Sequence, residues 1–410
     1  MGEYAQLLRS NRAFGTLLTA TAVSNMGSAM TNLALPILAY RMTGSVLAVG
    51  LMWTIRIASS FLVLPLAGVL ADRWDRRRAV ILGNMASALV DLGFIVAMAL
   101  RNVWALYALI FILQGLNRLM GPAGAALYPV VLKREQLVTA NGLRSGLDTS
   151  LQALAPAIGA GIALRWGVAW LFAADAVSFV LAAGMLLLIP VGREHLAGRP
   201  APLGFSLRSV SQGLHAVRSS AVLLTAFAVG FLGAAVARSF DVAAVALADR
   251  TLHVGVERVG YLYSAMSVGA LAASLAVPLL GVRRWGIRAV GLAQFAAGAS
   301  LVLLITASGL KAALGVLAAW MLADTLGGVV LESAVQKTVP AELYGRVSSL
   351  RLLTFTLGSL AGVGLGSAAA EWPATYPLAI GGAVMAATGM VLAGWRPVCT
   401  VDVEPSNVKE

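Results

Sequence analysis

The sequence of 410 residues contains little charge and almost no cysteine. Only 12% of its residues are charged and 59% are hydrophobic, whereas a soluble chain carries about twice that share of charge. The single cysteine, Cys399, follows the last apolar run, so an internal disulfide and a cysteine metal cluster are excluded. These shortages exclude a soluble globular protein and indicate a chain that crosses a membrane many times.

The common motifs of enzymes are also missing. The chain has no Gly-x-x-x-x-Gly-Lys-Ser/Thr loop for ATP, no His-Glu-x-x-His and no Gly-x-Ser-x-Gly. Its three histidines, His195, His215 and His253, lie between apolar runs and not inside them. We therefore expect no enzymatic activity, no cofactor and no metal.

Long apolar runs, by contrast, recur along the whole chain. A helix needs about 20 residues to cross the hydrocarbon core of a bilayer, and this length predicts about twelve membrane-spanning helices in an all-α polytopic protein. The predicted spans are Phe14–Tyr40, Val46–Ala71, Ala79–Leu100, Val103–Ala126, Leu137–Leu164, Trp170–Pro190, Leu223–Leu247, Val259–Leu280, Ala289–Ser308, Ala312–Val335, Leu350–Ala370 and Ala374–Gly394.

Positive charge is concentrated in alternate loops. The net charge of +12 would suggest a nucleic-acid partner in a soluble protein. Here arginines and lysines gather after the even-numbered spans, as in loops on the cytoplasmic side of a membrane. We therefore expect no nucleic-acid partner, a location in the cell inner membrane with lipid as the surroundings, and both termini in the cytoplasm.

The second and third apolar runs are joined by Gly68-Val-Leu-Ala-Asp-Arg-Trp-Asp-Arg-Arg-Arg78. This stretch resembles the loop motif of the major facilitator superfamily of transporters, Gly-x-Leu-Ala-Asp-Arg-x-Gly-Arg-Arg, with Asp75 in place of the second glycine. The resemblance implies two parallel six-helix repeats with a substrate site between them, and a loop that latches one conformation. The latch residues would be Gly68, Asp72, Arg73, Arg76 and Arg77, with Asp72 at a helix end and the arginines bridging helix ends across the halves.

Further stretches resemble one branch of this superfamily. Gly121–Pro129, Trp170–Phe179 and Val339–Ser349 are similar to segments of enterobactin exporters and macrolide efflux proteins. The fifth span resembles a helix-bend motif of drug antiporters, with matches at Gly142, Pro156 and Gly159. Small residues and a proline also fit ordinary close packing of membrane helices, so both interpretations of this span stay open.

Two halves are expected from an internal similarity. Pro65-Leu-Ala-Gly-Val69 returns as Pro278-Leu-Leu-Gly-Val282. The predicted domains are a six-helix bundle over 1–190, a cytoplasmic linker with an amphipathic helix over 191–220, a second bundle over 221–395 and a cytoplasmic tail over 396–410.

Several ionisable residues fall inside predicted spans, where a charge costs several kcal/mol unless it faces a cavity or a partner. They are Arg56, Asp91, Arg118, Asp148, Asp175, Arg238, Asp241, Asp324 and Glu332. Arg238 and Asp241 are three residues apart and are expected to pair. Arg118 follows Gln114-Gly115 of a proton-linked motif whose usual arginine is Ile110 here. As proton-carrying groups we rank Asp324 first, then Glu332, Asp241 and Asp91.

The function indicated by these features is a secondary active transporter. The hypothesis is a monomer that exports a small organic molecule, such as a drug, an antibiotic or a siderophore, by proton antiport. An importer or facilitator of a metabolite is the alternative within the same class, and a membrane enzyme or non-transporting scaffold is the alternative outside it. The few aromatic residues and mixed charges favour neither a lipophilic cation nor an anionic siderophore.

Overall fold

The computed structural model describes the backbone of residues 2–73, 75–189, 217–218, 220–280 and 286–394. Side chains are described there except at 2–3, 64–73, 134, 278 and 341–342. The predicted linker helix and tail lie outside the described residues, so the predicted domain boundaries stay a prediction.

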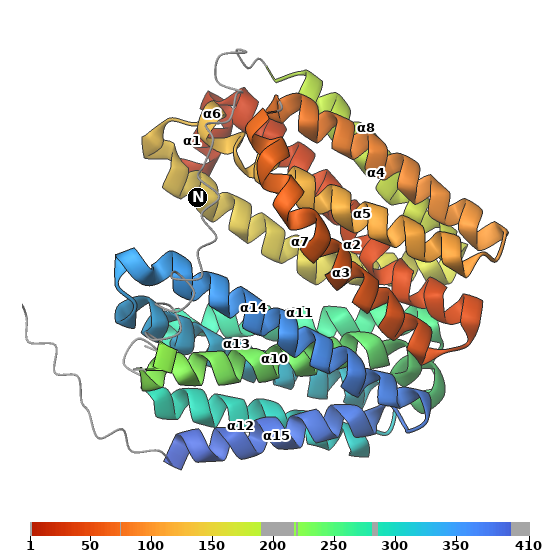
Figure 1. The fold of residues 1–410 in the computed structure, drawn as a ribbon, viewed down its shortest axis with the longest axis vertical. Helices are drawn as coiled ribbons and strands as arrows, with labels where there is room; N and C mark the ends of the chain where they lie inside the picture. Colours follow the sequence, from red (N-terminus) through yellow and green to blue (C-terminus); the bar gives the residue numbers. More distant parts are fainter. Residues whose placement is uncertain (1, 74, 190–216, 219, 281–285, 395–410) are drawn as a thin grey trace, which may run out of the picture.

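The described residues form twelve long helices, and the predicted fold class is confirmed (Figure 1). Eleven of them are long and apolar enough to cross a membrane. The twelve are α2 (Arg12–Thr43), α3 (Val46–Arg73), α4 (Arg76–Ala99), α5 (Val103–Ala125), α7 (Leu137–Trp166), α8 (Ala169–Leu187), α10 (Ala221–Ala246), α11 (Val259–Leu279), α12 (Ile287–Leu303), α13 (Leu310–Thr338), α14 (Ala341–Ser367) and α15 (Thr375–Gly394).

Two short helices were not among the predicted spans. They are α1 (Gly2–Ser10) and α6 (Tyr128–Val131). Each is too short to cross a bilayer, so a search for long apolar runs passes over it. Leu7 of α1 is nonetheless buried against the cluster that contains Phe14 and Tyr128, which fixes both short helices to one end of the bundle.

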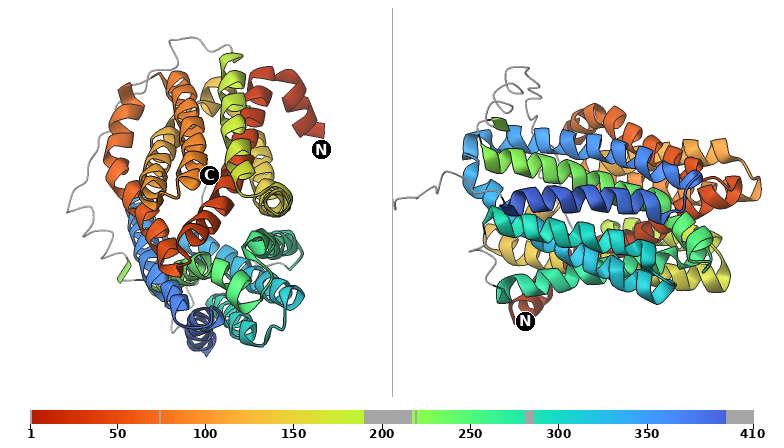
Figure 2. Two further views of the ribbon diagram at one scale, coloured as in Figure 1. Left: turned by 90° about the vertical axis from the view of Figure 1, so that its right-hand side faces the viewer. Right: turned by 90° about the horizontal axis from the view of Figure 1, so that it is seen from below.

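The long helices fall into two groups. In Figure 1 the helices α2 to α8 occupy one half of the molecule and α10 to α15 the other, and the left view of Figure 2 separates the same two groups. In the first group α2 and α4 pack on α8, and α3 packs on α5. In the second, α10 packs on α14, α11 on α13, and α12 on α15. Each half therefore has its own helix–helix interfaces.

Glycine allows the closest of these approaches. Gly362 of α14 faces the carbonyl oxygen of Ala235 in α10, and a Cβ at this position would overlap that oxygen. A turn earlier, Gly358 faces the carbonyl oxygen of Phe231 in the same way. The two glycines therefore form a close-packing face between the backbones of α10 and α14.

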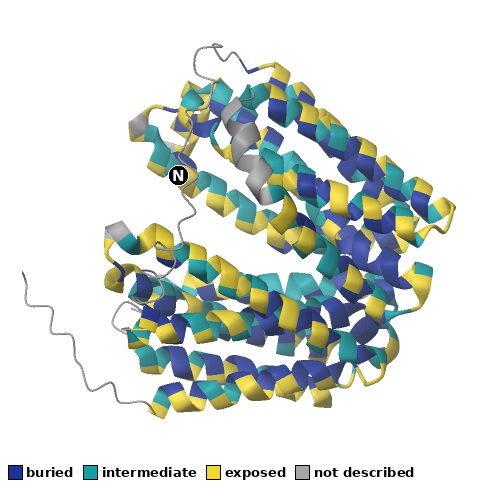
Figure 3. Ribbon diagram, in the orientation of Figure 1, coloured by how far each residue is buried: buried dark blue, intermediate teal, exposed yellow. Residues whose placement is uncertain are grey.

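The two halves meet near one end of the helices, which we call the turn end because it carries the α2–α3 and α10–α11 turns. There Gly260 of α11 lies against Pro156 and Ala160 of α7, and Gly50 of α3 lies against Ser367 of α14. From this end the two groups of helices diverge toward the opposite end in Figure 1. Many of the buried residues in Figure 3 lie where the halves meet.

Candidate functional site

A cluster of charged and aromatic residues lies between the two halves, near the middle of the helices. Arg238 of α10 donates a hydrogen bond from Nη1 to Oδ2 of Asp241 at 2.7 Å. The hydroxyl of Tyr263, on α11, donates to the other carboxylate oxygen of Asp241 at 3.0 Å. The predicted pair is therefore confirmed, and Tyr263, which no sequence pattern singled out, completes it.

Trp53 of α3 links this pair to the other half. The guanidinium carbon of Arg238 lies 3.9 Å from the centre of the Trp53 ring, and that of Arg56 lies 4.6 Å from it. Both arginines are thus within the range of cation–π attraction to a single ring. Nη2 of Arg56 also donates to Oδ1 of Asn32 on α2 at 2.7 Å.

A cavity of about 240 Å³ opens beside this cluster. Its polar wall includes Ser60 of α3, whose hydroxyl oxygen accepts hydrogen bonds from Gln114 Nε2 and Arg118 Nε of α5, each at 3.1 Å. The residues that line the cavity are Trp53, Arg56, Ile57, Ser60, Phe61, Gln114, Arg118, Arg238, Leu352, Phe355, Thr356 and Ser359. They come from α3 and α5 of one half and from α10 and α14 of the other.

The cavity is electropositive. All three charged residues in its lining are arginines, and Asp241 partners only one of them. Arg56 Nη1, Arg238 Nε and Trp53 Nε1 are buried without a hydrogen-bond acceptor in the described part of the chain. Buried donors without acceptors are costly, so this wall is suited to a ligand that supplies acceptor oxygens.

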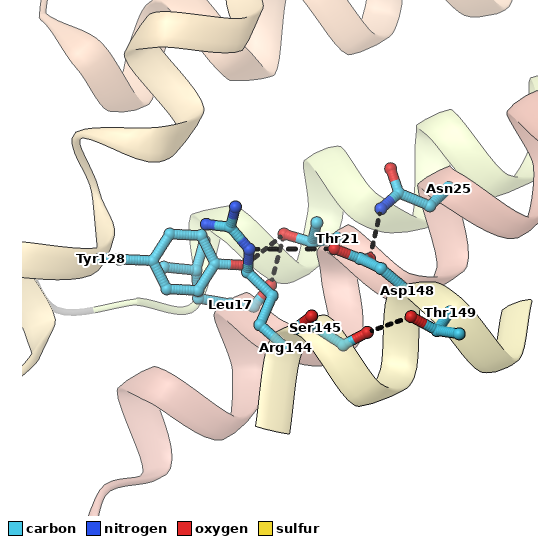
Figure 4. A network of polar contacts seen from close by, with 8 residues as sticks. All are labelled: Leu17, Thr21, Asn25, Tyr128, Arg144, Ser145, Asp148 and Thr149. Carbon is cyan, nitrogen blue, oxygen red and sulfur yellow. Dashed lines mark hydrogen bonds and ion pairs between the residues drawn. The ribbon is translucent and has the colours of Figure 1, made fainter. Parts of the chain in front are cut away.

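A second cavity, of about 420 Å³, lies within the first half. In Figure 4 Arg144 and Asp148 of α7 face α2, where Asn25 Nδ2 donates to Asp148 Oδ1 at 2.9 Å. Arg144 Nε lies 3.8 Å from Asp148 Oδ2, and its guanidinium carbon lies 5.0 Å from the centre of the Tyr128 ring. Asp148 is thus partly exposed and paired.

A third hollow, of about 390 Å³, is lined by Asn25, Asp148 and Asn32. Asn32 is also the residue that receives the hydrogen bond of Arg56. Polar side chains on α2 and α7 therefore continue from the central cluster toward the end of the bundle at which α2 begins.

The other candidate carboxyl groups are not brought together with this cluster. Asp91 and Asp175 are fully buried between α4 and α8, inside the first half. Glu332 accepts a hydrogen bond from Arg351 Nη2 at 2.6 Å. Asp324 has no hydrogen-bond or ion-pair partner among the described residues and lies one turn after Trp320 on α13.

The predicted latch lies at the start of α4. The side chains of Gly68, Asp72 and Arg73 are outside the described residues. Arg76 begins α4, and Arg77 donates to the carbonyl oxygens of Leu186 and Leu187 at 2.9 and 2.6 Å. In this conformation Arg77 thus binds the end of α8 in its own half.

Asp75, which departs from the family motif, has a clear local role. Its Oδ1 accepts a hydrogen bond from the backbone N–H of Arg78 at 3.1 Å, as the N-cap of α4. A carboxylate at this position satisfies a free backbone donor and stabilises the helix dipole. The missing glycine is therefore replaced by a helix cap.

Residues of the predicted helix-bend motif lie on α7, which continues through Pro156. The carbonyl of Pro156 lies against Gly260 in the other half, and Gly159 packs on Leu33 of α2. Gly142 lies near Tyr4 of α1. Two of the three residues thus sit where α7 meets its neighbours closely, and the open choice between bend and packing stays a prediction.

At the turn end, polar residues from both halves form what we call the clasp, made of Tyr40, Arg41, Asp249, Arg250 and Glu257. Arg250 donates to the Tyr40 hydroxyl and to the Gly44 carbonyl, each at 2.9 Å. The Tyr40 hydroxyl donates to Asp249 Oδ2 at 3.0 Å, and Arg41 forms an ion pair with Glu257. Tyr40 ends the first predicted span and the other four residues lie in predicted loops, and no local signal reveals that they meet.

Twelve helices in two groups, with a polar cavity between the groups, define a multi-pass membrane transporter for a small molecule. The family model of the Major Facilitator Superfamily matches residues 17–363. The chain therefore belongs to the Major Facilitator Superfamily.

Relatives and solved structures agree with this assignment. The chain is 26% identical over 380 residues to the "Uncharacterized MFS-type transporter YfiS" of Bacillus subtilis, covering 89% of this chain and 88% of that protein. It is 26% identical over 279 residues to the enterobactin exporter EntS of Shigella boydii, covering 66% of this chain and 64% of the exporter, slightly under two thirds of its length.

The fold itself is shared with solved transporters. A bacterial homologue of the iron transporter ferroportin, solved in an inward-facing state, superposes with a TM-score of 0.71 at 17% identity over 94% of this chain and 99% of that one. The nucleoside transporter NupG gives a TM-score of 0.70 at 15% identity over 94% of this chain and 100% of that one.

Proposed function

We propose that the protein exports a small organic molecule from the cytoplasm across the cell inner membrane by alternating access, in exchange for protons. The observation that supports this most directly is the cavity between the halves, which takes Arg56 and Arg118 from one half and Arg238 from the other. A site built from both halves changes its accessibility when the halves rock against each other.

The arrangement of contacts supports the same mechanism. The clasp joins the halves at the turn end. There Arg250 donates hydrogen bonds to Tyr40 and Gly44 of the other half, and also to Ala370 of its own half. The loops at that end carry few positive charges, which by the positive-inside rule supports a position outside the cell. With both termini in the cytoplasm, the described conformation is open toward the cytoplasm and ready to load a molecule for export.

Proton coupling needs a carboxyl group that gains and loses a proton as access alternates. Asp324 fits this role best, because it lies on a membrane helix with no partner among the described residues. Glu332 is held by Arg351, and Asp91 lies in the interior of one half beside Asp175. Export rather than import is supported by the likeness to an enterobactin exporter.

The experiment is transport into inside-out vesicles that contain the protein, with a panel of macrolides, cationic dyes and catecholate siderophores. Each compound is tested with and without a protonophore. We expect accumulation of one class, lost when the protonophore is added. Accumulation that resists the protonophore would contradict proton antiport, and uptake only into right-side-out vesicles would favour the importer.

A further inference from the structure

We propose that the cavity of about 240 Å³ between the halves selects an organic anion that carries an aromatic ring, such as an aromatic carboxylate or a catecholate. This inference deepens the proposed function, because it names the class of molecule that the transporter carries. It rests on the residues of the cavity wall, which the structure places together from α3, α5, α10 and α14.

The first argument is charge. Arg56, Arg118 and Arg238 line the cavity, and no aspartate or glutamate with a described side chain does. Asp241 forms an ion pair with Arg238 and also attracts Arg56 electrostatically, so among the residues whose side chains are described one carboxylate faces three arginines. Two positive charges in a membrane are costly without a counter-ion, and an anionic ligand supplies one.

The second argument is the set of hydrogen-bond donors that lack an acceptor. Arg56 Nη1 and Arg238 Nε are buried and lack an acceptor within the described residues, as does Trp53 Nε1. Both arginines lie on the Trp53 ring, one from each half. A carboxylate or a pair of catecholate oxygens accepts several such hydrogen bonds at once, which is the geometry that guanidinium groups favour.

The third argument is the remainder of the wall. Phe61, Leu352 and Phe355 form its apolar part beside the indole of Trp53. An aromatic ring bound here packs on these side chains while its acidic group reaches the arginines. A cationic ligand lacks the acidic group that reaches the arginines, and a strongly hydrophilic ligand lacks the ring that packs on the apolar wall.

The test measures binding and not transport, so its result is independent of direction and coupling. The full-length protein in phosphatidylcholine liposomes is studied by equilibrium dialysis with salicylate, with salicylamide as the neutral isostere and with benzylammonium as the cation. We expect salicylate to bind at least about tenfold more tightly than either, because a charge-assisted hydrogen bond is stronger than a neutral one. Equal binding of all three would overturn the proposal.

Variants locate the binding. Arg56→Gln and Arg118→Gln should each weaken salicylate binding about tenfold, and Arg56→Lys should restore part of the loss. Arg165→Gln is the matched control, because Arg165 is exposed near the end of α7 and far from the cavity lining. Loss of binding in this control as well, or no loss in either cavity variant, would contradict the assignment.

A phosphate group of a lipid would satisfy the same arginines. The dialysis is therefore repeated in liposomes that contain phosphatidylglycerol. Unchanged salicylate affinity supports a soluble organic anion as the ligand. Abolished affinity would show that anionic lipid occupies the site, and would overturn the proposal. If the anion binds while vesicle transport fails, the substrate class stands and the proposed export does not.

Discussion

At the scale of single residues, Asp324 is the group on which proton coupling is predicted to depend. It is half-buried on α13 and has no partner among the described residues. Replacing it with asparagine removes the proton-binding group and keeps the size of the side chain. We expect Asp324→Asn to abolish protonophore-sensitive accumulation in inside-out vesicles, while binding of the same substrate changes by less than about threefold, or about 0.6 kcal/mol.

Glu332→Gln is the matched comparison on the same helix. Glu332 is held by Arg351 at 2.6 Å, so its charge is already committed to an ion pair. This variant should keep its response to the protonophore, although it loses some thermal stability with the ion pair. Intact coupling in Asp324→Asn together with lost coupling in Glu332→Gln would reverse the two roles.

Reasoning from the sequence identified some residues of the candidate site but not the residues that they contact. Arg56, Arg118 and Asp241 could be selected because a charge within an apolar run is rare. The pairing of Arg238 with Asp241 followed from a spacing of three residues on one helix. The meeting of Arg56 and Arg238 on Trp53 joins helices far apart in the chain, and no local pattern encodes such a contact.

At the scale of helices, the interface of α10 with α14 is predicted to depend on its glycines. A methyl group at Gly362 would overlap the carbonyl oxygen of Ala235. Gly362→Ala should therefore destabilise the protein by about 1–3 kcal/mol, the usual range for overpacking. Thermal unfolding in detergent measures the loss.

Gly364 provides the control for this substitution. It lies two residues further along α14, and a Cβ there meets nothing within 4 Å. Gly364→Ala makes the same chemical change on the same helix and should leave the unfolding temperature unchanged or slightly higher, since alanine favours the helix. Equal losses in the two variants would show that the helix and not its interface is sensitive.

The helices themselves were largely predictable, and the reason is physical. Every backbone group that crosses a bilayer has to be satisfied within its own segment, so each apolar run of sufficient length becomes a helix. The predicted span that starts at Leu350 is the main departure, because α14 begins at Ala341. Its first turns carry Arg346 and other polar residues, which lower the hydropathy without breaking the helix.

At the scale of the whole molecule, the conformation depends on which end of the halves is joined. Tight contacts of α3 with α14 and of α7 with α11 lie toward the turn end, and the clasp covers that end with hydrogen bonds. The motif between α3 and α4 lies toward the opposite end, where the resemblance to the family predicts a latch. In the proposed alternating access, the clasp would be exchanged for the latch.

The clasp therefore makes a prediction about the equilibrium between conformations. Arg250→Ala removes the donors to Tyr40 and Gly44 of the other half, and hydrogen bonds of a charged group contribute about 1.5–3 kcal/mol each. Spin labels at Thr43 and His253, in a Cys399→Ser background, report the distance between the halves at this end. We expect the variant to shift the distribution toward longer distances, because the outward-open state gains at least about tenfold in population.

Arg165→Ala, a truncation of an exposed arginine on α7 near the same end, should leave the distribution unchanged. A distribution that stays short in Arg250→Ala would mean that the glycine contacts of α3 and α11 hold this end closed without the clasp.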